Sequence, residues 1–261
     1  FADQVRMEIA RTDNTRLSIN GPRIVGSTPG REFMFMVPAT GKAPLKYSAK
    51  GLPEGLKLDE KTGIISGSLV TDGKWDVRVT VSDASGSVSR VLTIVGGKDK
   101  LALTPPMGWN SWYCWASAID QEKMQRAADA LVSSGLAAHG YAYVNIDDCW
   151  QGGRDASGEI QCNKRFPDMK ALGDYIHSKG LKFGIYSSPG PATCGGYTGS
   201  YLHEVRDAKT YAKWGVDFFK HDWCSYREIA KDHSLAELRK PYAIMRLALD
   251  ASGRDMVYSL C

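Results

Sequence analysis

The sequence predicts two kinds of fold in one chain: a small all-β sandwich, followed by about the first five strands of a (β/α)8 TIM barrel. Before residue 98, short strands alternate with turns, whereas after residue 102 helices alternate with strands. Polar and aromatic side chains also gather where each of the later strands ends. With 261 residues, the chain is long enough for two domains of ordinary size.

These patterns divide the chain into four segments. Residues 1–15 are left unassigned, and residues 16–97 form the predicted sandwich. Residues 98–102 form a linker after a pair of glycines, and residues 103–261 form the amino-terminal part of the barrel. The change in pattern across the linker indicates that the two domains are separate in sequence.

The sandwich segment is recognised by short strands at regular spacing. Residues 76–82 alternate polar and apolar side chains without a break, which is typical of a half-buried antiparallel strand. Turn-forming sequences separate it from the other predicted strands, at residues 32–37, 45–48 and 88–95. No cluster of acids, histidines or cysteines lies in this segment, so we assign it no chemistry.

The barrel segment repeats a unit of helix followed by strand. Apolar residues at helical spacing in 120–134 end at Gly135, and the apolar run 141–146 follows. Later helices are predicted after the N-cap Asp168, from residue 203 and from about Pro241. Five strands then start near residues 107, 141, 181, 216 and 255. A doubly wound sheet is the alternative, but no glycine-rich phosphate turn follows the first strand, which favours the barrel.

Charge, hydropathy and cysteine content restrict the partners and the compartment. The net charge is +4 without a long basic run, so neither nucleic acid nor an anionic membrane is predicted as a partner. No apolar run is long enough to span a membrane. Six cysteines without a C-x-x-C pair favour disulfides over a zinc site. Disulfides indicate a secreted or periplasmic protein, although reduced cysteines also occur in protein cores.

The fourth strand leads into a candidate nucleophile. Because side chains alternate along a strand, Lys220 and Asp222 are predicted on one face and His221 on the other. An ammonium beside a carboxylate favours the ionised carboxylate, which is the form that a nucleophile requires. The alternative is a buried salt bridge that closes the strand.

Carboxylates and an indole ring follow the second strand. Asp147 and Asp148 precede Trp150, and proteins bind sugars with such sets, because carboxylates accept from hydroxyls while aromatic rings cover the C–H face. Two consecutive residues cannot both point inward from a regular strand, so one of them is predicted at the bend into the loop. A loop cap or a divalent-cation site is the alternative. No further set of carboxylates supports a metal, so we predict neither a metal nor a cofactor.

Four motifs lie at the ends of predicted strands: Pro-Pro-Met-Gly-Trp-Asn-Ser-Trp at 105–112, Asp-Asp-Cys-Trp at 147–150, Lys-His-Asp-Trp-Cys at 220–224 and Tyr-Ser-Leu-Cys at 258–261. Together they resemble glycoside hydrolase family 27, the α-galactosidase and α-N-acetylgalactosaminidase family, over about residues 103–261. In the sandwich, two glycine-containing segments at 51–56 and 63–67 resemble the immunoglobulin-like modules that are often fused to bacterial carbohydrate enzymes.

The resemblance implies a retaining exo-glycosidase that hydrolyses terminal α-galactosides, with Asp222 as the catalytic nucleophile. Lys220 would hydrogen-bond the sugar and keep Asp222 ionised. Asp147 and Asp148 would bind the 4- and 6-hydroxyls, which distinguish galactose from glucose at the axial O4. The related activities α-N-acetylgalactosaminidase and β-L-arabinopyranosidase are alternatives, and a non-catalytic galactoside-binding protein is the alternative from another class.

The resemblance also implies the walls of the pocket and one disulfide. Trp112 and Tyr186 would flank the sugar, and Cys194 would form a disulfide with Cys224 beside it. Among the four remaining cysteines, Cys149 is the strongest candidate for a further pairing, with its partner left open.

Two departures from the family pattern matter. His221 stands where many relatives have Tyr or Phe, and because strand alternation turns it away from the pocket, we interpret it as a packing residue. The family's acid/base Asp lies after the position of Cys261. A five-stranded fragment also leaves two open edges where a closed barrel has none. We therefore expect a remaining part of the barrel, as further sequence or as a separate piece, to complete the enzyme.

Overall fold

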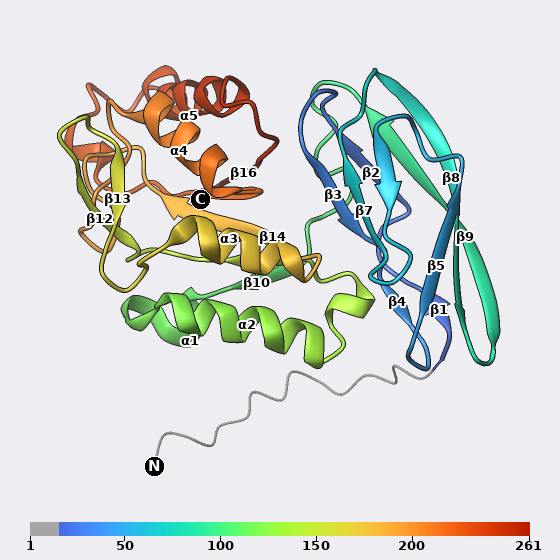
Figure 1. The fold of residues 1–261 in the computed structure, drawn as a ribbon. Coiled ribbons are helices and arrows are strands. Elements are labelled where there is room, and N and C mark those ends of the chain that lie inside the picture. Colours follow the sequence, from blue (N-terminus) through green and yellow to red (C-terminus); the bar gives the residue numbers. More distant parts are fainter. Residues whose placement is uncertain (1–15) are drawn as a thin grey trace, which may run out of the picture. The chain divides into compact units, whose positions relative to one another are not determined.

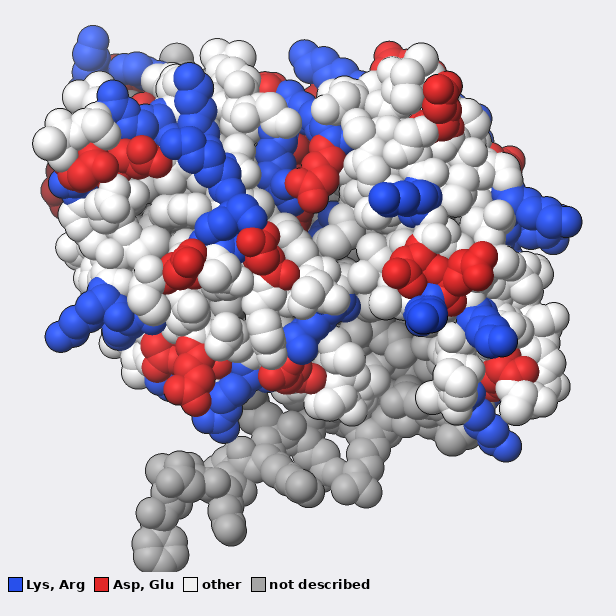
Figure 2. Space-filling model, viewed as in Figure 1, with Lys and Arg blue, Asp and Glu red and all other residues white. Residues whose placement is uncertain are grey.

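The computed structural model describes residues 16–261, which form two compact units (Figure 1). The unassigned residues 1–15 lie outside the described part. One unit holds the chain up to residue 107 together with 126–142 and 179–181, and the other holds 108–125, 143–178 and 182–261. Within the described residues, no helix is both long and apolar enough to cross a membrane. Figure 2 shows acidic and basic side chains interspersed over the visible face.

The first unit contains the β-sandwich. One sheet has the strand order β2-β9-β8-β5, a second has the order β3-β7-β6, and β1 pairs with β4. The alternation predicted around residue 79 is confirmed, because Val77, Val79 and Val81 are buried with Leu92 and Ile94 of the next strand. The strands are β1 (Ser18–Ile19), β2 (Ile24–Ser27), β3 (Phe33–Met36), β4 (Ala39–Thr40), β5 (Lys46–Lys50), β6 (Leu56–Leu58), β7 (Ile64–Gly67), β8 (Gly73–Asp83) and β9 (Gly86–Gly96).

The second unit is built on a five-stranded sheet with the order β10-β11-β14-β15-β16, and every neighbouring pair is parallel. Strands that follow one another in both chain and sheet are what repeated βα units of a barrel produce. The partial (β/α)8 barrel is thereby confirmed. Its strands are β10 (Gly108–Asn110), β11 (Tyr143–Asn145), β14 (Lys182–Ser187), β15 (Phe218–His221) and β16 (Val257–Leu260).

Helices connect these strands at the predicted places. Helix α3 packs against β14 and α4, and α4 packs against α5. The predicted cap of α3 is formed, since the backbone N–H of Ala171 donates to Asp168 Oδ1 at 2.8 Å. The helices are α1 (Trp112–Trp115), α2 (Gln121–Ser133), α3 (Met169–Ser178), α4 (Glu204–Trp214) and α5 (Leu235–Asp250), with short 3₁₀ turns at Ala116–Ala118, Ala137–His139 and Tyr226–Glu228.

Two features of the second unit differ from the prediction. Helix α5 begins at Leu235, so Pro241 lies inside it and does not start it. The reason is the cap at Ser234, whose Oγ accepts from the N–H of Glu237 at 3.3 Å. An antiparallel hairpin, β12 (Gln151–Arg154) with β13 (Ile160–Cys162), also follows β11 and was not predicted. This hairpin carries part of the loop structure at the carboxyl end of the sheet.

Candidate active site

The carboxyl ends of the parallel strands bring the predicted residues together. Asn145 of β11 is in register with Gly184 of β14, and Tyr186 of β14 is in register with Lys220 of β15. Asp147 follows β11 by two residues, and Asp222 follows β15 directly. Five adjacent strand ends therefore present their loops at one edge of the sheet, which is where barrel enzymes carry their active sites.

Asp147 and Lys220 form the central ion pair of this edge. Lys220 Nζ donates to Asp147 Oδ2 at 2.8 Å, and the Asp147 side chain is nearly fully buried. Burial lowers the pKa of Lys220, but the hydrogen bond and charge of Asp147, with the charge of Asp222, outweigh it and leave the pKa raised. Lys220 Nζ also lies 5.0 Å from the centroid of the Tyr186 ring. The ammonium therefore remains charged over a wide pH range.

The alternative of a salt bridge between Lys220 and Asp222 is not the one formed, because Lys220 pairs with Asp147. Strand β15 ends at His221, so the alternation of a regular strand no longer fixes the direction of the Asp222 side chain. The backbone still continues the ladder, because the N–H of Asp222 donates to the carbonyl of Ser187 at 3.0 Å. Lys220 is bonded to Asp147, and its effect on Asp222 is that of a nearby charge.

Asp148 is held by the loop that follows β14. Its Oδ2 accepts from the N–H of Gly195 at 2.6 Å, and its Oδ1 accepts from the N–H of Cys149 at 2.6 Å. Burial raises the pKa of Asp148, and these bonds, with one from the Thr193 side chain, only partly oppose that rise. One of the two carboxylates is predicted at the bend into the loop, and Asp148 lies there, because Cys149, with a φ of 78°, turns the chain directly after it.

Tyr186 is a buried wall of the site. Its hydroxyl donates to Asp222 Oδ2 at 3.3 Å and lies 3.4 Å from the sulfur of Cys224. Burial, and then the charges of Asp148, Asp222 and Asp147, raise the pKa of the Tyr186 hydroxyl. Tyr186 therefore stays protonated and acts as a hydrogen-bond donor to Asp222.

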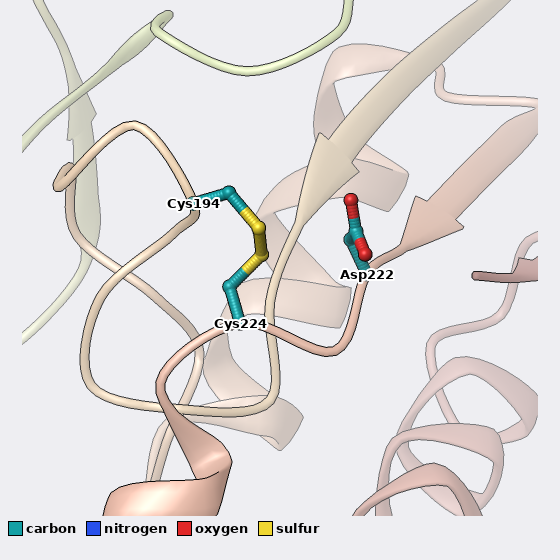
Figure 3. Close-up of side chains that lie close together, drawn as sticks. All are labelled: Cys194, Asp222 and Cys224. Atoms are coloured by element: carbon teal, nitrogen blue, oxygen red, sulfur yellow. A yellow bond between two sulfur atoms is a disulfide. The ribbon is translucent and has the colours of Figure 1, made fainter.

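The disulfide between Cys194 and Cys224 is formed and lies beside Asp222 (Figure 3). The Cα atoms of the two cysteines are 5.0 Å apart, which is within the normal range for a disulfide. A carboxylate oxygen of Asp222 and both sulfurs lie within 4.8 Å of one another. Because the sulfurs are bonded to each other and are not thiolates, this cluster does not offer the ligands of a metal site.

Among residues 16–261, the further pairing expected at Cys149, with its partner left open, is not formed. Cys149 is a buried free thiol, and Cys114, Cys162 and Cys261 are also free. Burial, and then the charge of Asp148, raise the pKa of the Cys149 thiol to about 11. Cys149 therefore contributes a packed, protonated thiol beneath the Asp148 turn.

Trp112 lies partly exposed at this edge of the sheet, whereas His221 is packed in the interior. Trp112 begins α1 with 37% of its side chain exposed, and its neighbour Ser111 accepts from the N–H of Asp147 at 2.9 Å. His221 is fully buried, and its Nδ1 lies 2.7 Å from the hydroxyl of Tyr258. Burial lowers the pKa of His221 to about 3, so the ring is neutral at physiological pH.

One residue of this edge was missed as a site candidate. The Cys261 thiol hydrogen-bonds to Asp222, and burial followed by the charge of Asp222 raises the pKa of that thiol. Cys261 follows β16, and its N–H donates to the carbonyl of His221 at 3.1 Å. The signal was present in the sequence, because Cys261 stands at the carboxyl end of the fifth predicted strand.

Parallel strands in chain order, with carboxylates, a lysine and aromatic side chains at their carboxyl ends, define a (β/α)8-barrel protein with a polar site at that edge. The family model described as Alpha galactosidase A matches residues 104–261, and a model described as "Putative Ig domain" matches residues 16–96. The chain therefore belongs to the α-galactosidase family, glycoside hydrolase family 27, and carries an immunoglobulin-like module before its barrel.

Similar proteins agree with this assignment. The Alpha-galactosidase A of Cellvibrio japonicus is 48% identical over 182 residues, which are 67% of this chain and 43% of that protein. A Bacteroides fragilis structure described as a "putative alpha-galactosidase" is 43% identical with a TM-score of 0.90, and the match covers 95% of this chain and 52% of that one. A Saccharomyces cerevisiae α-galactosidase with raffinose is 36% identical with a TM-score of 0.60, covering 62% and 36%. The chain spans less than half the length of the curated relatives it matches.

Proposed function

We propose that this chain supplies the nucleophile and much of the sugar pocket of a retaining exo-α-galactosidase. The observation that carries the proposal is the position of Asp222. Its carboxylate lies at the carboxyl end of β15, beside the Tyr186 hydroxyl and the disulfide, while the neighbouring ammonium of Lys220 is bonded to Asp147. Within the described residues Asp222 therefore has no salt bridge, and no bonded cation competes with a sugar for its carboxylate.

In this mechanism a carboxylate oxygen of Asp222 forms a bond to the anomeric carbon as the bond from that carbon to the aglycone oxygen breaks. The departing oxygen keeps the bonding electron pair and takes a proton from a second carboxylic acid. Water then attacks the glycosyl-enzyme, releases galactose and restores Asp222. A retaining reaction requires that second carboxyl group about 5 Å from Asp222.

The ion pair and the loop contacts account for recognition of the sugar. Asp147 and Lys220 form a fixed donor and acceptor pair that can bind vicinal hydroxyls, and Asp148 is oriented by Gly195 and Cys149. We assign Asp147 and Asp148 to the 4- and 6-hydroxyls of galactose. A pentose has no 6-hydroxyl, so this set favours a hexose over an arabinopyranoside.

The compartment follows from the disulfide. Cys194 and Cys224 are bonded beside the nucleophile, and disulfides of this kind persist in oxidising compartments. We infer that the protein is exported, as a secreted or periplasmic enzyme.

Activity of the full-length protein tests the proposal. We expect hydrolysis of 4-nitrophenyl α-galactoside and raffinose, and much slower hydrolysis of the α-N-acetylgalactosaminide and β-L-arabinopyranoside. The variant Asp222→Asn should be inactive, while Asp174→Asn, which removes an exposed carboxylate on α3, should match the wild type. Full activity of Asp222→Asn would exclude the nucleophile, and galactoside binding without turnover in the wild type would favour the non-catalytic alternative.

A further inference from the structure

The turn after β11 is strained at Cys149. Its φ of 78° lies in the left-handed region that residues with a Cβ rarely adopt, and such strain persists only where the surrounding structure holds it. The turn comes directly after Asp148, whose Oδ1 accepts from the N–H of Cys149 at 2.6 Å and whose Oδ2 accepts from the N–H of Gly195 at 2.6 Å. The geometry of the Asp148 carboxylate therefore depends on what holds Cys149.

Two side chains bind the Cys149 carbonyl. Asn163 Nδ2 donates to it at 2.8 Å, and Arg165 Nη2 donates to it at 2.6 Å. The two residues also support each other, because Asn163 Oδ1 accepts from the N–H of Arg165 at 2.9 Å. Asn163 is fixed in turn by its own N–H, which donates to the carbonyl of Trp150 at 2.9 Å. The strained turn is thus clamped from the segment that follows β13.

Arg165 reaches two further loops. Its Nη1 donates to the carbonyl of Ser117, next to Ala116, which has a second left-handed backbone with a φ of 41°. Its Nη2 also donates to the hydroxyl of Tyr197 at 3.3 Å. Ser117 follows β10, Cys149 follows β11 and Tyr197 follows β14, so one guanidinium contacts the loops after three successive strands.

We propose that Arg165 is a positioning residue for the galactoside site, because it fixes the strained Cys149 turn and thereby orients Asp148. The inference rests on the proposed function for what that carboxylate binds. A planar guanidinium has donors in a rigid fork that can reach separate acceptors at once, whereas the single ammonium of lysine cannot reproduce that fork. Arg165→Lys therefore keeps the positive charge and removes the forked guanidinium donors that bind the Cys149, Ser117 and Tyr197 acceptors.

The test compares Arg165→Lys with a matched control in the full-length protein. Arg254→Lys makes the same substitution at the opposite end of the sheet, where Arg254 donates to Asp217 at 2.8 Å and to the carbonyl of Val216 at 2.9 Å. The measurements are the dissociation constant of galactose, kcat and KM for 4-nitrophenyl α-galactoside, and Tm. We expect Arg165→Lys to weaken galactose binding and raise KM by about tenfold, because small displacements of binding groups cost that much or more. Arg254→Lys should lower Tm and leave galactose binding unchanged.

A second variant and a second measurement test the role of Arg165 independently of the first comparison. Asn163→Ala removes the other donor to Cys149 and should weaken galactose binding in the same direction, even if Arg165→Lys folds poorly. Hydrogen exchange of the peptide that spans residues 145–151 should accelerate in both variants, whatever the enzyme's activity. Unchanged exchange, or equal losses of affinity in Arg165→Lys and Arg254→Lys, would overturn the role of Arg165. A wild type that does not bind galactose would instead overturn the proposed function, and the exchange experiment would still decide the role of Arg165.

Discussion

The two ends of the five-stranded sheet hold their carboxylates in opposite ways. At the amino end, Asp217 is bonded to the N–H of Phe183 at 2.9 Å, to Arg254 at 2.8 Å and to His177 at 2.7 Å. At the carboxyl end, Asp222 accepts from the Tyr186 hydroxyl at 3.3 Å and from the Cys261 thiol, without a bonded cation among the described residues. The first carboxylate is saturated by its neighbours, whereas the second keeps capacity for a ligand.

The pKa values of carboxyl groups at the two ends of the sheet are shifted in opposite directions. Burial alone would raise the pKa of Asp217, but the charges of Lys182, His177 and Arg254, with the hydrogen bond from His177, hold it far below its usual value. Burial instead raises the pKa of Asp148 at the other end. A barrel can therefore use the amino end of its sheet for stability and the carboxyl end for chemistry, and the comparison predicts which substitutions separate the two.

The largest effect is expected for Asp222→Asn. Loss of the nucleophile should lower kcat on the order of a thousandfold or more, because replacing a residue of a catalytic triad in other enzymes lowers kcat by at least that factor. The Tm should change little, because within the described residues Asp222 takes part in no salt bridge. Steady-state kinetics check the loss of kcat, and a melting curve on the same sample checks that the Tm is nearly unchanged. A large loss of Tm would mean that Asp222 is a structural carboxylate like Asp217.

Asp217→Ala should give the converse result. Removing this carboxylate leaves the largely buried side chain of Arg254 and the N–H of Phe183 without this partner, which should cost about 3 kcal/mol or more of unfolding free energy. At temperatures where the variant is folded, KM should equal that of the wild type. Urea denaturation and kinetics measure the two quantities, and a raised KM would contradict the division between the ends.

Removal of the disulfide should lower both the stability of the protein and its affinity for galactose. The double variant Cys194→Ala with Cys224→Ala opens a loop with a sequence separation of 30, which should cost about 3 kcal/mol. It should also weaken galactose binding, because the adjacent Gly195 N–H orients Asp148. Cys114→Ala, at an exposed free cysteine, is the control and should alter neither quantity. Wild-type affinity in the double variant would show that the loop holds Asp148 without the disulfide.

The smallest effect is a pH dependence that differs between the ends. The pKa of His221 falls from 6.5 to about 3 on folding, so the stability from its neutral form is complete above pH 6.5 and declines as pH falls toward 3. The pKa of Asp217 is lowered from 3.8, so its contribution declines only as pH falls below that value. Urea unfolding of His221→Phe between pH 7.5 and 4.5 should show a flatter slope than the wild type. An identical slope would mean that other groups produce the acid sensitivity.

Much of the second unit could be predicted because its pattern is local. Helices ending at Gly135 and Gly180 and strands of buried residues repeat at a regular interval, so the order of the sheet follows from the sequence. Pro241 misplaced the start of α5, because the weak signal of the Ser234 cap lies about two helical turns before it. The local pattern therefore identifies elements better than it fixes their ends.

The residues of the site could be predicted from the sequence, whereas several of their contacts could not. Strand ends identified Asp147, Lys220 and Asp222, but the partner of Lys220 depends on a distance between residues 73 positions apart in the chain. The role of Arg165 depends on the loops after three strands, and no spacing in the sequence brings those loops together. Contacts of this kind require the folded structure.

The identity of the nucleophile is tested most directly by trapping the glycosyl-enzyme. A fluorinated galactosyl fluoride that forms the intermediate faster than water removes it should inactivate the full-length protein, and galactose should protect against it. After proteolysis, mass spectrometry should find the sugar on the peptide that contains Asp222, attached through that carboxylate. A label on another carboxylate of the active wild-type enzyme would contradict the account.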